Sequence, residues 1–414
     1  MSSRRSWAGK VLALLFGGCI LLVFTGCGNT FRPVAIPISQ NGGDPGGLRN
    51  AIIVSANGSS QGTTMHIDVS GDTVVSEHPV GVGPVQAVLA GGRTWVANKS
   101  DGTLTGYTTF GGPGTSTNTV TLPAGACPVS MSSTETQTLY VADPGSGCAR
   151  GGNGNVDVIG MVSAAFSAQV PVGVNPVSIA ELPDQAKIYV ANRGSNSVTV
   201  INAVDHSVKT TIPVGSSPSF LVPSSDSACV YVANQGDGTV SVIATGSDAV
   251  VLPMNSSTPL STGSGPTFMA FDSNQQRVYV ANTAGDSVTM IPHTNTCVTD
   301  PTKVKTVALP AGSSPVSLAP LADGTRVYVA SSGCASAHVI NASSLTLKQF
   351  PSTPCNGIPI GANPVSVGAS SDNTRVYVAN QGSGNVSIIN PGNDTELTRI
   401  TASSPSPVYV LLTP

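Results

Sequence analysis

Histidine and cysteine are the residues best suited to hold a metal or to perform catalysis, and the chain contains five and eight of them. The histidines are His66, His78, His206, His293 and His338, which share no repeat position and form no H-x-H or H-E-x-x-H motif. No C-x-x-C-H motif is present, so covalent haem is not expected. Residues 58–62 read Gly-Ser-Ser-Gln-Gly, the letters of a nucleophile elbow, but they lie between two predicted strands rather than between a strand and a helix. We therefore predict no catalytic residue, no metal ligand and no cofactor.

The composition favours short strands and tight turns. Only 9% of the 414 residues are charged, against roughly 25% in typical soluble domains, while 40% are hydrophobic. Glycine (46 residues) and proline (31 residues) are abundant, which suits turns and disfavours helices. The net charge is −3 and no basic patch is present, so we expect no nucleic-acid partner.

The N-terminus has the pattern of an export signal. Arg4, Arg5 and Lys10 precede a continuous apolar run over residues 11–24, which is too short to span a bilayer but typical of a signal peptide. The run is followed by Thr25-Gly26-Cys27.

This arrangement resembles a bacterial lipoprotein signal, although Phe24 stands where leucine is usual. The resemblance implies that residues 1–26 are removed and that Cys27 receives the lipid that anchors the chain to a membrane. Residues 27–47 would then form a flexible tether, and residues 48–414 the folded domain of an exported cell-envelope protein. An ordinary secretory signal with an incidental cysteine is the alternative, and the Arg4-Arg5 pair faintly resembles a twin-arginine signal.

One hairpin motif recurs through the rest of the chain. The segment Tyr377-Val-Ala-Asn is matched by copies that begin at Trp95, Tyr140, Tyr189, Tyr231, Tyr279 and Tyr328, and we align a degenerate first copy at Val54. The copies lie 41 to 49 residues apart, a period typical of propeller blades or solenoid turns. Each period contains four strand patterns, the first of which is opened by proline. Four antiparallel strands per repeat indicate a β-propeller blade.

The two ends of the repeat region complement each other. The first repeat, at Arg49, lacks the proline-led strand, and the C-terminal segment Ser406-Pro407-Val-Tyr-Val-Leu-Leu is such a strand without a repeat after it. We predict that this strand pairs into the N-terminal blade and closes the ring, which removes exposed blade edges. The count gives an all-β propeller of eight blades, or seven if the first repeat does not form a full blade.

The Tyr-Val-Ala-Asn strand, its Gly-rich turn and the following Val-x-Val-Ile strand resemble the YVTN-type β-propeller repeat over about residues 48–414. That family includes microbial surface-layer and periplasmic proteins, and lactonase-like and quinoprotein-like propellers are similar to it. Because propellers host many activities, the resemblance indicates the fold far more than the function.

The asparagine that ends the recurring strand is predicted to be structural. Asparagine side chains often bond the backbone of the turn that follows them, and this residue recurs with the fold unit. We therefore assign turn capping, and not ligand binding, to the five asparagines Asn98, Asn192, Asn234, Asn282 and Asn380. The aspartates that precede the strand, Asp323 and Asp372, are given the same role, because they lack the clustered oxygens that calcium needs.

Cys19 would leave with the leader and Cys27 would carry the lipid, so six of the eight cysteines remain, an even number for an oxidising compartment. Their places in the repeats lead us to predict three disulfides, Cys127–Cys148, Cys334–Cys355 and, by elimination, Cys229–Cys297.

The loops at one mouth of the ring are mostly Gly, Ser, Asn and Pro. Their charged exceptions are Lys99, Asp101, Asp143, Arg150, Arg193, Asp237 and Asp286. We interpret these as solvated loop charges rather than as a catalytic set. The sequence thus favours a monomeric, non-catalytic binding or scaffolding module with an envelope protein or glycan as ligand. A lactonase-like or quinoprotein-like enzyme, which would bring several His, Arg, Glu or Asp residues together in one pocket, is the alternative, and a surface-layer-like structural role also stays open.

Overall fold

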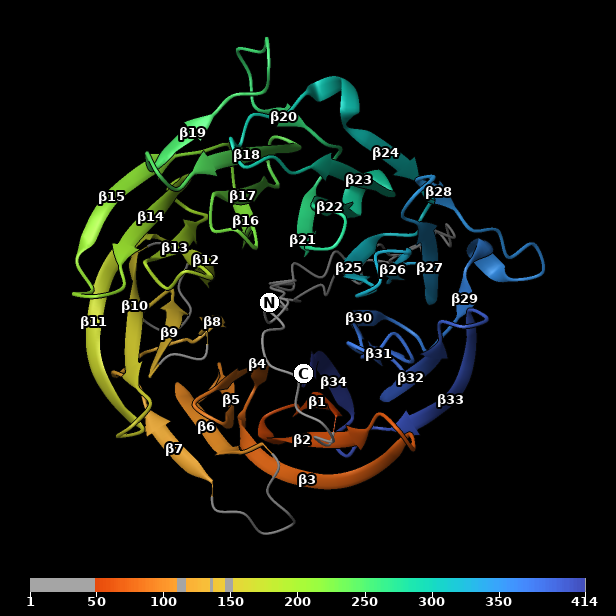
Figure 1. Ribbon diagram of the computed structural model, residues 1–414. Coiled ribbons are helices and arrows are strands. Elements are labelled where there is room, and N and C mark those ends of the chain that lie inside the picture. Colours follow the sequence, from red (N-terminus) through yellow and green to blue (C-terminus); the bar gives the residue numbers. More distant parts are fainter. Residues whose placement is uncertain (1–48, 110–116, 135–136, 146–151, 414) are drawn as a thin grey trace, which may run out of the picture. The chain divides into compact units, whose positions relative to one another are not determined.

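The computed structural model describes residues 49–109, 117–134, 137–145 and 152–413. The chain divides into two compact units, residues 1–30 and 31–414, and every described residue belongs to the second. Within the described ranges, the strands form eight antiparallel sheets that stand as blades around a ring (Figure 1). The predicted all-β, eight-bladed propeller is therefore confirmed, and the seven-bladed alternative is excluded.

In each blade, four strands follow one another from the inside of the ring outwards. Blade 1 consists of β34 (Ser406–Leu412), β1 (Asn50–Asn57), β2 (Ser60–Asp68) and β3 (Thr73–Val82). Blade 2 consists of β4 (Pro84–Ala90), β5 (Arg93–Asn98), β6 (Thr103–Thr108) and β7 (Asn118–Thr121). Blade 3 consists of β8 (Ser130–Ser132), β9 (Thr138–Asp143), β10 (Asn153–Gly160) and β11 (Ala165–Val174). Blade 4 consists of β12 (Pro176–Glu181), β13 (Lys187–Asn192), β14 (Ser197–Asn202) and β15 (Val208–Pro213).

The second half of the chain repeats this order. Blade 5 consists of β16 (Pro218–Pro223), β17 (Cys229–Asn234), β18 (Thr239–Ala244) and β19 (Ala249–Val251). Blade 6 consists of β21 (Pro266–Asp272), β22 (Arg277–Asn282), β23 (Ser287–Pro292) and β24 (Lys305–Ala308). Blade 7 consists of β25 (Pro315–Pro320), β26 (Arg326–Ser331), β27 (Ser336–Asn341) and β28 (Thr346–Leu347). Blade 8 consists of β30 (Pro364–Ala369), β31 (Val376–Asn380), β32 (Asn385–Asn390) and β33 (Thr395–Thr401).

Two blades have an interrupted outer strand, because the chain leaves the sheet and returns to it. The short strands β20 (Leu260–Ser261) and β29 (Ile358–Pro359) pair with β18 and β27 after these insertions. Three short 3₁₀ turns, η2 (Thr283–Gly285), η3 (Pro301–Lys303) and η4 (Pro354–Asn356), are the helical elements of the described ranges. None of the helices among the described residues has the length and apolar character to cross a membrane.

The C-terminal strand closes the ring as predicted. β34 pairs antiparallel with β1, so that Ile53 lies opposite Val410. Beyond this ladder, the backbone N–H of Thr413 donates to the carbonyl oxygen of Asn50 at 2.9 Å. The inner strands of neighbouring blades contact one another in turn around the whole ring.

The alignment of the first repeat needs a correction. In complete repeats the proline of the inner strand lies opposite the recurring asparagine, as Pro176 lies opposite Asn192. In blade 1, Pro407 lies opposite Ser55, so Ser55, and not Asn57, occupies the asparagine position. The longer hairpin between β1 and β2 places an Asn two residues further on, which is why matching the letters gave the wrong register.

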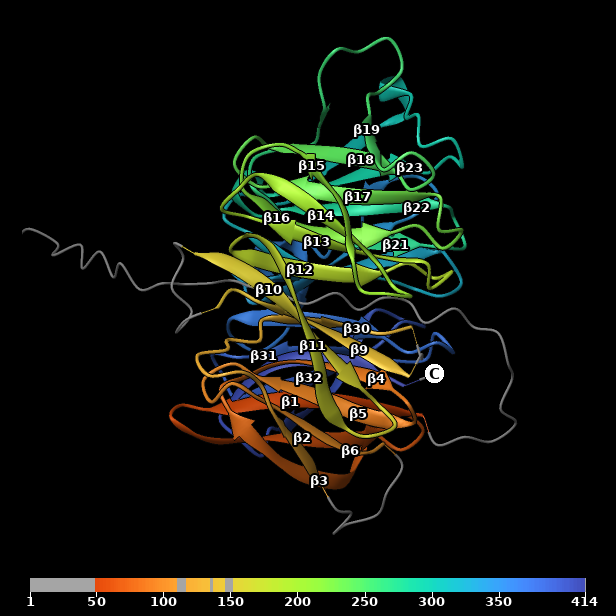
Figure 2. The same ribbon diagram turned by 90° about the vertical axis from the view of Figure 1, so that its left-hand side faces the viewer.

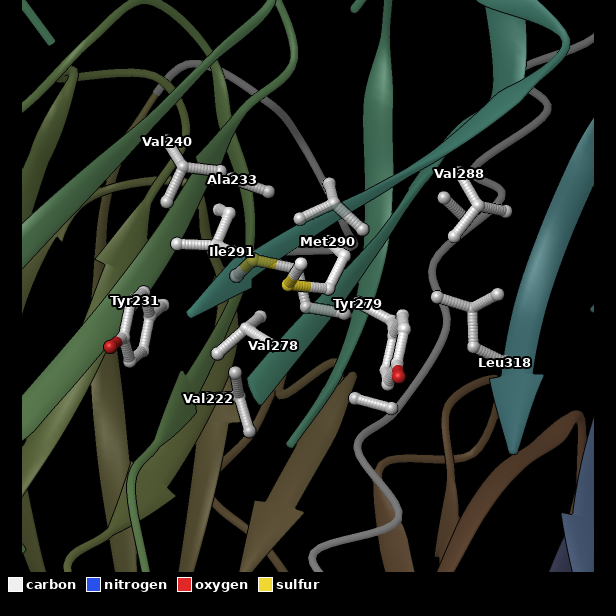
Figure 3. Packing of buried hydrophobic residues seen from close by; sticks show 14 of the residues in the cluster. Val222, Tyr231, Ala233, Val240, Val278, Tyr279, Val288, Met290, Ile291 and Leu318 are labelled. Atoms are coloured by element: carbon white, nitrogen blue, oxygen red, sulfur yellow. The ribbon is translucent and has the colours of Figure 1, made fainter. Parts of the chain in front are cut away.

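The core lies between blades, since both faces of the central strands are covered. The valine and tyrosine side chains of the repeat point to opposite faces of the sheet, and each face packs against a neighbouring blade. Figure 3 shows this for blades 5 and 6, where Tyr231 and Val278 belong to one buried cluster that extends to Leu318 of blade 7. β11, which faces the viewer in Figure 2, also contacts β13 and β14 of blade 4.

Candidate functional site

The recurring asparagines lie at the end of the second strand and are completely buried. Their amide nitrogens donate to hydroxyl groups of the third strand. Asn192 donates to Ser197 at 3.3 Å and to Thr199 at 2.9 Å. Asn98, Asn234, Asn282 and Asn380 donate in the same way to a residue five positions on and to a hydroxyl seven positions on. The role is structural, but the bonds join two strands instead of capping the backbone of the turn.

A glycine covers this amide from the loop that enters the inner strand. A Cβ placed on Gly215 would lie 2.6 Å from Cγ of Asn234, and Gly81 and Gly173 have the same relation to their asparagines. The glycine that begins the Gly-x-x-Pro turn is therefore required by the close approach to the amide. The turns between second and third strands and these entering loops form one face of the ring, which we call the hairpin face.

Blade 3 departs from this pattern with two carboxylates. Asp143 occupies the asparagine position, and Asp157 lies opposite Val141 just as Thr199 lies opposite Val190. Asp157 is fully buried and Asp143 is 2% exposed. The backbone N–H of Cys127 donates to Oδ1 of Asp143 at 2.7 Å, and that of Gly145 does so at 2.8 Å. Two acidic side chains thus replace an amide and a hydroxyl in the interior.

The environment of Asp157 favours its protonated form. Burial is the main cause that raises the pKa of Asp157 to about 7; a hydrogen bond from Gln169 opposes this rise and the nearby Asp143 contributes to it. Gln169 donates to Oδ1 at 2.9 Å, while Oδ2 has no hydrogen-bond partner among the described residues. A carboxyl group with a raised pKa is one element of acid–base catalysis. Here the burial of Asp157 and Asp143 keeps both away from a substrate in this conformation, and a protonated Asp157 is a neutral donor like the hydroxyl of the other blades.

Blade 7 departs from the pattern with a serine and a histidine. Ser331 occupies the asparagine position, and its Oγ lies 2.7 Å from Nδ1 of His338. Nε2 of His338 lies 2.8 Å from the carbonyl oxygen of Cys355. Since a carbonyl only accepts, Nε2 carries the proton and Nδ1 accepts from the serine hydroxyl. The pair has the connectivity of a nucleophile and its base, but both residues are completely buried, so we assign it the cross-strand role of the asparagine.

The charged residues of the hairpin face are used to hold its loops. The backbone N–H of Val82 donates to Asp101 at 2.7 Å, and that of Ser216 donates to Asp237 at 2.5 Å. Asp286 accepts from the backbone of Gly312 and Ser314 in the same manner.

Two further members of the predicted charged set, Arg193 and Lys99, lie in hairpin turns, and Arg193 donates to Gln235 of the next blade at 2.5 Å. Arg150 lies outside the described residues. An open depression of about 310 Å³ between blades 5 and 6 is lined by residues 235–238, Ser261 and residues 263–265.

Carboxylates on the opposite face connect neighbouring blades. Asp394 of blade 8, 1% exposed, binds Arg326 at 2.7 Å and Lys348 at 2.6 Å, both from blade 7, and accepts from the hydroxyl of Tyr328. We call this arrangement, a carboxylate of one blade with a cation and a tyrosine of the preceding blade, an inter-blade latch. Asp394, Arg326 and Lys348 also line a second depression of about 360 Å³.

The complete latch recurs between blades 4 and 5, and an ion pair alone stands at the corresponding position between blades 8 and 1. Asp248 of blade 5 binds Lys187 at 2.9 Å and Lys209 at 2.7 Å, and it accepts from Tyr189 at 2.6 Å. Arg375 of blade 8 binds Asp72 of blade 1 at 2.9 Å. All three aspartates have a positive φ in the turn between third and fourth strands.

Two predicted disulfides are present among the described residues. Cys229 bonds to Cys297, with Cα atoms 5.7 Å apart, and Cys334 bonds to Cys355, with Cα atoms 6.0 Å apart. Cys127 is also disulfide-bonded, and its predicted partner Cys148 lies outside the described residues.

The Cys229–Cys297 disulfide takes the place of a latch. Cys229 precedes Tyr231 by two residues, as Lys187 precedes Tyr189, and Cys297 belongs to the next blade. The bond is therefore a covalent tie at a position where other interfaces carry an ion pair.

The histidines are not brought together as one metal site. In the described ranges, no group of three or more His, Cys, Asp or Glu side chains is arranged to hold a metal ion. His66 and His78, however, are neighbours across blade 1, with ring centroids 5.2 Å apart. This contact was not predicted from the sequence, because the two residues lie on adjacent strands of the degenerate repeat.

Comparisons with known proteins agree with the fold. Residues 205–317 match the family described as lactonase, 7-bladed beta-propeller, which is about a quarter of a chain that itself has eight blades. A search of curated protein sequences gave no match.

Three similar solved structures illustrate the range of propellers. The periplasmic gluconolactonase of Pseudomonas aeruginosa is 18% identical with a TM-score of 0.60, and the match covers 89% of this chain and 99% of that one. A putative 6-phosphogluconolactonase of Bacteroides fragilis is 15% identical with a TM-score of 0.59, covering 90% and 100%. The dihydro-heme d1 dehydrogenase NirN is 13% identical with a TM-score of 0.66, covering 91% and 76%. At these identities the likeness concerns the fold alone.

Proposed function

We propose that this protein is an exported cell-envelope propeller that acts as a non-catalytic binding or scaffolding module through its hairpin face. A lipid on Cys27 would anchor it, with residues 1–26 removed and residues 27–47 as a tether. The disulfides support export to an oxidising compartment, and a similar propeller is a periplasmic protein.

The main support for a binding role is that the carboxylates of the hairpin face are hydrogen-bonded to the backbone of the protein itself. Asp101, Asp237 and Asp286 each accept a hydrogen bond from the backbone of an entering loop. A catalytic base must instead reach a substrate proton. These carboxylates shape a rigid polar surface of glycine, serine and asparagine, and such a surface suits recognition of an envelope protein or a glycan.

A lactonase-like enzyme is the second candidate, because part of the chain matches that family. Its chemistry would be sought at the depression of about 360 Å³, where Arg326, Lys348 and Asp394 meet. In this structure their charges are already paired with one another.

A hydrolysis assay and a binding assay on the same purified protein distinguish the two candidate functions. Hydrolysis of gluconolactone and 6-phosphogluconolactone is followed by proton release, and bound envelope proteins and glycans are recovered from extracts of the source cells. We expect hydrolysis at the uncatalysed rate and a ligand whose binding is weakened by Arg193→Glu on the hairpin face. Lys305→Glu, an exposed charge reversal on β24, is the matched control and should bind normally.

Hydrolysis that exceeds the background and is lost in Lys348→Gln would replace the binding role with the enzymatic one. The anchor is tested separately, since Cys27→Ser should move the protein from the membrane fraction to the soluble fraction.

A further inference from the structure

The interface between blades 1 and 2 contains an unusual buried cluster of aromatic rings. His66 of β2, His78 of β3 and Tyr107 of β6 are respectively 0%, 2% and 0% exposed. Nε2 of His66 lies 2.9 Å from the hydroxyl of Tyr107, and the His78 ring is stacked on Tyr107 at a centroid distance of 4.2 Å. Two imidazoles are therefore enclosed between blade 2 and blade 1, the blade in which the C-terminal strand β34 pairs with β1.

Each imidazole has a nitrogen that the fold leaves unsatisfied. Nδ1 of His66 and Nε2 of His78 are buried and have no hydrogen-bond partner among the described residues. A neutral imidazole tolerates this better, because one ring nitrogen then carries only a lone pair. A protonated imidazole must donate from both nitrogens, and a buried N–H without an acceptor is costly.

The groups that face His66 offer it no counter-charge. His78 faces it from β3 and Tyr107 from β6, with Tyr409 of β34 in the surrounding apolar cluster of Ile52, Val54 and Val80. Glu77 of β3 lies opposite Met65, on the other face of the sheet from His78, where it accepts from Ser403.

Burial and, to a smaller extent, the charge that His78 can acquire together lower the pKa of His66 to about 4. Burial also lowers the pKa of His78.

The other described histidines either have polar partners for their ring nitrogens or are partly exposed. His293 contacts the carboxylate of Asp226 at 3.1 Å, and His338 uses both nitrogens in hydrogen bonds. His206 is only half-buried, beside the ring of Tyr140.

We propose that the His66–His78–Tyr107 cluster is an acid-sensitive joint, at which the propeller ring loosens between blades 1 and 2 as the medium is acidified. Protonation of the cluster places a cation in an apolar interface that has no acceptor for it. Separation of blade 2 from blade 1 gives the cation access to water. The loosening is local, because the strands of each blade keep their own ladders.

Hydrogen exchange tests the joint on the purified protein between pH 7 and pH 4, with exchange times scaled to the intrinsic chemical rate. We expect protection of β2, β3 and β6 to fall by up to about tenfold per pH unit below pH 6.5, the response to one extra proton in the open form. The interface of blades 5 and 6, tied by Cys229–Cys297, serves as the internal reference and should keep its protection.

Variants distinguish protonation of the cluster from a general effect of acid on the protein. His66→Phe with His78→Phe keeps the ring packing and should abolish the local pH dependence, whereas His206→Phe should leave it unchanged. Imidazole C–H signals in NMR spectra of the wild-type protein provide a readout that needs no variant, and His66 should titrate near pH 4. The proposal is overturned if the imidazoles of His66 and His78 titrate near pH 6.5, or if protection falls equally in every blade. It also fails if the double variant retains the local loss of protection.

Discussion

Replacing Asp157 by asparagine should stabilise the protein at alkaline pH and leave it unchanged in acid. The folded-state pKa of about 7 lies above the ordinary value of 3.8, so the folded protein holds a proton that the unfolded chain releases. The stability linked to this proton is complete below pH 3.8 and is lost as the pH rises to 7. A displacement of roughly three units at 1.36 kcal/mol each corresponds to about 4 kcal/mol. Asparagine is neutral at every pH and avoids this loss.

Urea denaturation from pH 4 to pH 8.5 measures the effect. The free energy of unfolding of Asp157→Asn minus that of the wild type should be near zero at pH 4 and should approach about 4 kcal/mol above pH 7. Asp205→Asn is the matched control, because Asp205 is exposed and hydrogen bonds from Ser207 lower its pKa. The control should show no such gain.

A constant difference between variant and wild type across the range would refute the reasoning. It would mean that Asp157 is ionised in the folded state or that a counter-ion compensates its charge. A gain in Asp205→Asn equal to that in Asp157→Asn would indicate an effect of net charge and not of burial.

Three further changes test the contacts that hold the ring. Cys229→Ser with Cys297→Ser should lower the free energy of unfolding by about 4 kcal/mol, the loop-entropy value for this separation, in denaturant titrations; an unchanged midpoint would contradict the inter-blade tie. Asp394→Asn should cost about 2 kcal/mol, because the carboxylate is buried while both cations it binds are partly exposed, and 0.5 M NaCl should not remove this cost if the pairing is as buried as the structure shows. Asn192→Ala should cost about 2 kcal/mol through two lost hydrogen bonds, whereas the exposed Asn393→Ala should unfold at the wild-type midpoint.

The repeats made the fold predictable, because each copy carries the proline and glycine positions that mark its strands. Ring closure followed from two incomplete repeats that supply each other's missing strand. The register of blade 1 did not follow, since its longer hairpin put an asparagine two residues beyond the position that pairs with Pro407.

The buried polar pairs could be predicted only in part from the sequence. Alignment of Val156-Asp-Val-Ile with Val198-Thr-Val-Ile places Asp157 at the threonine position, a signal that comparison of third strands would have found. The latch between Asp394 and its cations joins segments of different blades. No spacing within one repeat encodes such a contact, because it depends on how adjacent blades stack.

The two titratable sites affect global stability in opposite directions. His66, with its pKa lowered from 6.5 to about 4, makes the folded state more stable as the pH rises over this interval. Asp157, with its pKa raised to about 7, makes it less stable over nearly the same interval. Each slope is about 1.4 kcal/mol per pH unit, so these two contributions cancel between pH 4 and pH 6.5.

The cancellation is tested by removing one site at a time. Relative to the wild type, the stability of Asp157→Asn should rise with pH and that of His66→Phe should fall, while the two changes together should restore the wild-type profile. The sites lie in blades 1 and 3, on opposite sides of blade 2, and share no contact in the structure, so their effects should add. A single variant whose profile between pH 4 and pH 6.5 matches the wild type would show that its site does not titrate as inferred. Because the two contributions cancel in the wild type, its global stability hides pH effects that hydrogen exchange resolves blade by blade.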